Sequence, residues 1–150
     1  MVIQRIQSLY LLIAAILMVV FAFFPALTFD FGGKEFMYGA INAGPVGMTH
    51  VAPLMLVLVI LIAVLAFIDI FLFKNLQRQM TVCFVDIIIA LAMLIAIGVQ
   101  AVVFGGKVGV SNVMPQWSLV LPVLAIIFLM LAHKAMSRDK KKLIDADRLR

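Results

Sequence analysis

The stretch that decides the fold reads APLMLVLVILIAVLAFIDIFLF (residues 52–73), KNLQRQMT (74–81) and VCFVDIIIALAMLIAIGVQAVVF (82–104). Two long apolar runs are joined here by one short polar turn. A helix needs about 20 mainly apolar residues to cross the hydrocarbon core of a bilayer. This stretch therefore predicts a hairpin of two transmembrane helices.

Two further apolar runs flank this hairpin, at residues 6–24 and 117–135. The first is too long for the apolar core of a secretory signal, which has about 7–15 residues, so we interpret it as an uncleaved span. Composition agrees, because 66% of the residues are hydrophobic and 13% are charged, against about 25% charged in globular domains. We expect an all-α membrane protein, a single up-down four-helix bundle over residues 1–150 with a basic tail at 136–150.

The placement of lysine and arginine predicts the orientation of the spans. If the chain crosses the membrane four times, all but two of its 12 Lys and Arg residues fall on one side. The exceptions are Lys34 and Lys107. Because cytoplasmic segments carry the excess of positive residues, both termini are predicted to lie in the cytoplasm.

Residues 26–49 form the one sizeable loop outside the cytoplasm. Polar and apolar residues alternate on both sides of Gly32-Gly33, which predicts a small β-hairpin with a two-residue turn. An isolated hairpin is marginal in water, so it needs the membrane surface or a partner for support. The residues that follow it, and those at 105–115, are expected to form irregular loops.

Asp69 and Asp86 place a carboxylate in each arm of the central hairpin. A charged side chain at a helix centre costs about 2.5–3.5 kcal/mol on the insertion scale, and by default it indicates a functional site. One hypothesis is a proton or cation site between the second and third spans, with Lys74 and Arg78 beside it. The other, favoured by the shallow depth, is structural: the carboxylates hold the turn through bonds to Lys74, Arg78 or Arg5.

The basic tail is expected to contact lipid or a partner through Lys140, Lys141, Lys142, Arg148 and Arg150. Basic residues beside a span are attracted to anionic headgroups. The net charge of +5 does not indicate nucleic acid, because the cations lie beside apolar runs. We expect membrane lipids as partners, together with a membrane-protein partner or further copies of the same chain.

The sequence lacks the residue patterns of known catalytic and metal sites. The single cysteine, Cys83, excludes an intrachain disulfide and a paired-cysteine zinc site. His50 and His133 are expected at opposite membrane faces, so they cannot share a metal or haem. We therefore expect no cofactor and no enzymatic activity. The leading hypothesis is a structural or accessory subunit. The alternative is a small oligomeric transporter or channel that uses Asp69 and Asp86. A polar cavity that reaches these two residues would favour the alternative.

The two ends and the central turn resemble one known family. The opening Ile3-Gln-Arg-Ile-Gln-Ser-Leu-Tyr-Leu-Leu12, the turn Leu72-Phe-Lys-Asn75 and the ending Asp147-Arg-Leu-Arg150 are similar to the bacterial family called domain of unknown function 4293. The resemblance covers essentially the whole chain. It implies a small four-span protein of the Gram-negative inner membrane, and it implies no activity, cofactor or catalytic residue. The Lys140-Lys-Lys142 stretch departs from the more acidic tail of that family.

Overall fold

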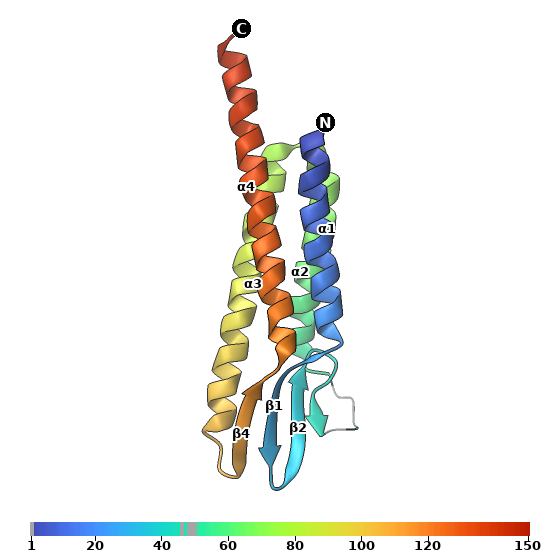
Figure 1. Ribbon diagram of the computed structural model, residues 1–150, viewed down its shortest axis with the longest axis vertical. Coiled ribbons are helices and arrows are strands. Elements are labelled where there is room, and N and C mark those ends of the chain that lie inside the picture. The colour runs from blue at the N-terminus through green and yellow to red at the C-terminus, as the bar shows by residue number, and fades with distance from the viewer. Residues whose placement is uncertain (1, 46, 48–50) are drawn as a thin grey trace.

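The computed structural model describes residues 2–45, 47 and 51–150, with side chains from residue 6 onward. Its helices lie side by side, with a small sheet at one end and both chain termini at the other (Figure 1). The elements in chain order are α1 (Val2–Ala22), β1 (Pro25–Phe31), β2 (Lys34–Gly39), β3 (Gly44–Pro45), α2 (Pro53–Phe71), η1 (Leu72–Lys74), α3 (Leu76–Gly105), β4 (Val110–Pro115), η2 (Trp117–Leu119) and α4 (Val120–Arg148).

The four α-helices form a ring in which each contacts its neighbours in the chain, and α1 closes the ring against α4. On α2 the buried residues follow one another at alternating spacings of four and three: Met55, Val59, Ile62, Ala66 and Asp69. On α3 the same rule holds for Gln79, Cys83, Asp86, Ala90, Met93 and Ile97. Such spacing is typical of a left-handed helix–helix seam. Both aspartates therefore occupy core positions.

The outward faces of the helices are also apolar. On α3, for example, Ile95 is 68% exposed and Val102 is 76% exposed. Among the described residues, three helical segments are long and apolar enough to cross a membrane, and the apolar part of α1 is shorter, at Ile6–Ala22. The three long segments are Pro53–Lys74, Leu76–Gly105 and Trp117–Arg148. An outer surface of this kind is suited to lipid, because exposed apolar patches of this extent are rare on soluble proteins.

The predicted β-hairpin is present. β1 and β2 are antiparallel, with Phe31 paired to Lys34 across the turn. Gly32 and Gly33 have φ values of +58° and +78°, as both central residues of a type I′ turn require. The short strand β3 pairs with the outer edge of β2, so part of the loop expected to be irregular is also a strand.

The segment before α4, expected to be an irregular loop, contains β4. It pairs antiparallel with β1, with Met114 opposite Thr28, and completes a sheet of order β3-β2-β1-β4. Gln116 donates from Nε2 to the hydroxyl of Thr28 (2.9 Å), and the hydroxyl of Ser118 donates to the carbonyl of Pro25. The all-α expectation is therefore corrected to a mainly helical protein with a four-stranded sheet that fixes the start of α4.

Two helices extend beyond the predicted spans. α3 begins at Leu76 rather than near Val82, because the side chain of Asn75 caps it by accepting from the backbone N–H of Arg78 (3.4 Å). α4 continues to Arg148, well past the predicted end of the fourth span at residue 135. The last part of α4 projects beyond the ends of the other helices (Figure 1).

Candidate functional site

Asp69 of α2 and Asp86 of α3 form a buried carboxyl pair. Both have 0% exposed surface, and they lie near each other and near the Cys83 thiol. Asp69 precedes the last residue of α2 by less than one turn. Asp86 lies about 15 Å along α3 at the helical rise of 1.5 Å per residue, deeper than a span beginning near Val82 would place it.

The four carboxyl oxygens of Asp69 and Asp86 have no hydrogen-bond partner among the residues that the structure describes. The expected bonds to Lys74 and Arg78 are absent there, and both cations are exposed at the end of the hairpin. The side chain of Arg5 lies outside the described residues. A buried polar group left without a partner costs about 1–3 kcal/mol. The described contacts thus do not support the hypothesis that these carboxylates hold the turn.

Other polar groups hold this region together. Gln79, which is 2% exposed, donates from Nε2 to the backbone carbonyl of Asp69 (3.1 Å) and so connects α3 to α2. Cys83 donates from Sγ to the carbonyl of Leu129 (3.4 Å), which connects α3 to α4. The sequence interpretation assigned Gln79 to the turn, although the alternating spacing to Cys83 and Asp86 is a signal that could have placed it in the core.

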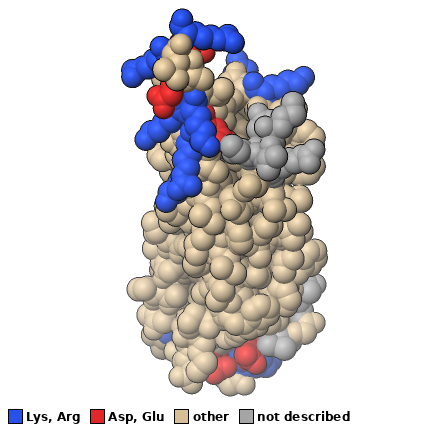
Figure 2. Space-filling view, turned by 45° about the horizontal axis from the view of Figure 1, so that its top comes forward, with Lys and Arg blue, Asp and Glu red and all other residues tan. Residues whose placement is uncertain are grey.

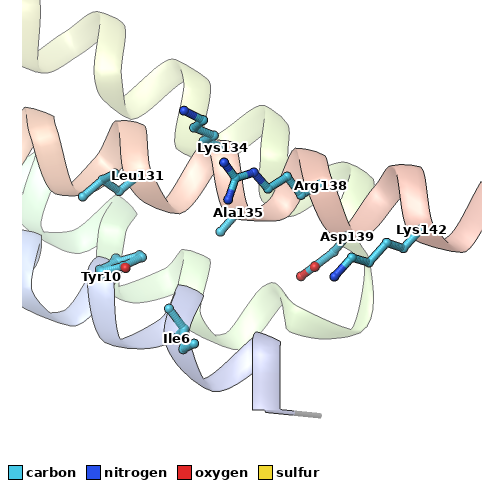
Figure 3. A pocket seen from close by; sticks show the side chains of 8 residues that line it. All are labelled: Ile6, Tyr10, Leu131, Lys134, Ala135, Arg138, Asp139 and Lys142. Atoms are coloured by element: carbon cyan, nitrogen blue, oxygen red, sulfur yellow. The ribbon is translucent and has the colours of Figure 1, made fainter.

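A second polar contact joins α1 to α4. Gln7, which is 1% exposed, donates from Nε2 to the carboxylate of Asp139. Beside this bond the two helices leave a surface groove of about 340 Å³. Its lining residues are Ile6, Tyr10, Leu131, Lys134, Ala135, Arg138, Asp139 and Lys142 (Figure 3). One predicted tail residue, Lys142, therefore belongs to this groove.

The other predicted tail residues lie in the last turns of α4 or directly after it. Lys140 donates to the side-chain oxygen of Gln77 at the start of α3. From Lys141 to Arg150 every residue is exposed. Figure 2 shows lysine and arginine gathered at this end, a broad surface without charged residues below them, and a small charged group at the opposite end.

The described residues contain no group of three or more His, Cys, Asp or Glu side chains that could hold a metal ion. His133 lies beside Phe84, with ring centroids 6.1 Å apart. His50 lies outside the described residues. The expectation that the two histidines lie at opposite membrane faces therefore stays untested.

Long apolar helices, an apolar outer surface and charges gathered at the ends are the features of a membrane protein. The chain belongs to the family described as Domain of unknown function (DUF4293), whose model matches residues 3–149. The resemblance in the two ends and the central turn is thereby confirmed. None of the curated proteins matches the chain, and the family description names no activity.

Proposed function

We propose that the protein spans the bacterial inner membrane four times, with both termini in the cytoplasm. The three long apolar helices and the apolar α1 packed between α2 and α4 support this arrangement. Lys34 begins strand β2 and Lys107 lies between α3 and β4, whereas the remaining cations belong to the end that carries the termini. The positive-inside rule then assigns the sheet to the periplasm. Family membership supports the inner membrane through the resemblance described above.

We further propose that the protein is a non-enzymatic accessory subunit that binds a partner through the end of α4. The observation that carries this proposal is that every residue from 141 to 150 is exposed, although the chain stays helical to Arg148. Leu143, Ile144 and Leu149 are 61%, 46% and 89% exposed there. Most of the stability of helices in proteins comes from packing of their apolar face, so a surface that covers this apolar edge would stabilise the end of α4.

Affinity purification from native membranes in mild detergent tests the accessory role. We expect the wild-type chain to retain a stoichiometric partner and Leu143→Gln/Ile144→Gln to lose it. Val108→Gln is the control, because Val108 is 98% exposed at the opposite end, and it should retain the partner. A homo-oligomer with no other protein, or equal retention by all three chains, would contradict the proposal.

One observation favours a second function, a small oligomeric transporter or channel that uses Asp69 and Asp86. Buried carboxyls without described partners are costly, and intramembrane carboxylates often mark ion or proton pathways. However, neither side chain has exposed surface, so the described arrangement offers no water-filled route to them. This absence of access is why the accessory role is preferred.

Proton flux into proteoliposomes tests the transporter. If the carboxyl pair is a coupling site, Asp69→Asn and Asp86→Asn should abolish the flux while the amount of folded protein is maintained. Asp145→Asn, in the exposed tail, should leave the flux unchanged. A wild-type chain that conducts no protons would remove the proton-coupled form of this second function, and a fall in folded yield alone would indicate a structural role.

A further inference from the structure

The groove between α1 and α4 contains three cations that follow one another at every fourth residue of α4. They are Lys134, Arg138 and Lys142. Residues at this spacing lie on one face of a helix, and Figure 3 shows their side chains along one stretch of α4, with Tyr10 and Ile6 of α1 across the groove. Among the described residues, the side chain of none of these three cations forms a hydrogen bond or an ion pair.

The groove keeps an excess of positive charge. Asp139 is its one acidic residue, and this carboxylate already accepts the hydrogen bond from the buried Gln7. With one carboxylate and three cations, the groove has a net positive charge, which favours the binding of an anion. The planar guanidinium of Arg138 can offer two parallel donors to a phosphate group, which an ammonium cannot do.

An apolar trough adjoins the basic groove. Leu131 and Lys134 also line a second groove, of about 570 Å³, between α3 and α4. Its remaining residues are Phe84, Ile87, Ile127, Met130 and His133. Most of these residues are apolar. Those on α4 precede Lys134 in the chain, so this groove extends from Lys134 away from the charged end of α4. A ligand with an anionic head and long apolar chains fits both surfaces, whereas a free phosphate would leave the trough uncovered.

We propose that this groove is a binding site for an anionic phospholipid. The lipid phosphate lies between Lys134 and Arg138, and an acyl chain follows Leu131 into the α3–α4 trough. Basic pockets between membrane helices on the cytoplasmic side are suited to anionic headgroups. The site rests on the proposed membrane orientation, and it is independent of the partner proposed for residues 141–150.

Native mass spectrometry from detergent containing phosphatidylglycerol and phosphatidylcholine tests the site. The wild-type chain should retain phosphatidylglycerol in preference to phosphatidylcholine. Lys134→Gln/Arg138→Gln should weaken this retention about thirtyfold, as the loss of two charge contacts implies. The matched control, Lys141→Gln/Arg148→Gln, removes the same two charges from residues of α4 that do not line the groove, and it should change the retention less than about threefold because neither side chain contacts the bound phosphate.

A second variant tests the shape of the groove. Ala135→Leu reduces the space beside the cations without changing any charge, and it should also displace phosphatidylglycerol. Thermal unfolding without added lipid checks that each variant is folded. If Lys134→Gln/Arg138→Gln does not fold, the result for Ala135→Leu decides whether the groove binds the lipid. Equal losses in the groove and tail variants would overturn the proposal, since they would indicate diffuse attraction to the basic end.

Inorganic phosphate distinguishes a lipid from a free anion. We expect inorganic phosphate to leave phosphatidylglycerol bound when the two are present at equal concentration. Displacement at equal concentration would overturn the lipid assignment. Loss of the lipid site would leave the partner test at Leu143 and Ile144 unaffected, so the two proposals can fail separately.

Discussion

Replacement of Asp86 with valine is expected to stabilise the protein. The side chain of Asp86 has 0% exposed surface, and its carboxyl oxygens have no hydrogen-bond partner among the described residues. An unsatisfied buried polar group costs about 1–3 kcal/mol, whereas valine and aspartate differ little in helix propensity. The free energy of unfolding should therefore rise by about 1–3 kcal/mol in Asp86→Val.

Unfolding in mixed detergent and dodecyl sulfate, followed by helical circular dichroism, measures this difference. The same substitution at two other aspartates supplies the controls. Asp139→Val removes the acceptor for Gln7 and should lower the free energy of unfolding by about 0.5–1.5 kcal/mol. Asp145→Val changes an exposed tail residue and should stay within about 0.5 kcal/mol of the wild type.

A destabilisation of Asp86→Val as large as that of Asp139→Val would refute this reasoning. It would show that the Asp86 carboxyl has a stabilising partner in the folded protein. In that case the structural hypothesis for the carboxyl pair would regain its support.

Three further predictions concern single residues. Gly39→Ala should destabilise the protein by about 1–3 kcal/mol, because the added Cβ would lie 2.9 Å from the Cα of Pro25. The same substitution at Gly98 adds a Cβ that meets nothing within 4 Å, so Gly98→Ala should stabilise α3 by about 0.5–1 kcal/mol. Chemical unfolding would contradict this prediction if the two changes had the same sign. Burial raises the pKa of the Tyr38 phenol above its ordinary value of 10.0. The folded state then holds the phenol proton more tightly than the unfolded state does. The contribution of Tyr38 to the free energy of unfolding is therefore complete below pH 10, and it is lost as pH rises through the pKa of the folded state. Unfolding measured across alkaline pH should show a shallower decline in Tyr38→Phe, and an unchanged decline would oppose the prediction. Cys83 is 0% exposed, so a maleimide should modify it only after denaturation; rapid labelling of the folded protein would argue against its burial.

The helices and the hairpin could be predicted because their signals are local. Apolar runs of bilayer length mark α2, α3 and α4, and Gly32-Gly33 marks the turn between β1 and β2. The start of α3 could not be placed in this way. The residues after the capping Asn75 are mostly polar, so they resemble a continuing turn rather than the first turns of a helix.

The strand β4 was missed because its pairing is not local. Its partner β1 precedes α2 and α3 in the chain, and no short-range pattern reports such a contact. Within Val110–Pro115 the sequence lacks regular alternation, and Asn112 has a φ of +52°, which is uncommon for a strand residue. The four-stranded sheet therefore exceeds what the hairpin signal alone could predict.

The environment of the carboxyl pair depends on the rotation of the helices about their axes. The sequence predicts that Asp69 and Asp86 are costly and close to a basic turn. The alternating seam spacing turns both side chains inward, while Lys74 and Arg78 remain exposed. Nearness along the chain is thus a poor guide to pairing here, because these charged side chains lie on different faces.

Cysteine labelling in spheroplasts is the most direct test of the proposed membrane arrangement. In a Cys83→Ala background, Lys107→Cys reports on the end with the sheet and Arg150→Cys on the end with the termini. We expect a membrane-impermeant maleimide to label Lys107→Cys in intact spheroplasts and Arg150→Cys only after permeabilisation. Labelling of Arg150→Cys in intact spheroplasts, with Lys107→Cys protected, would contradict the arrangement.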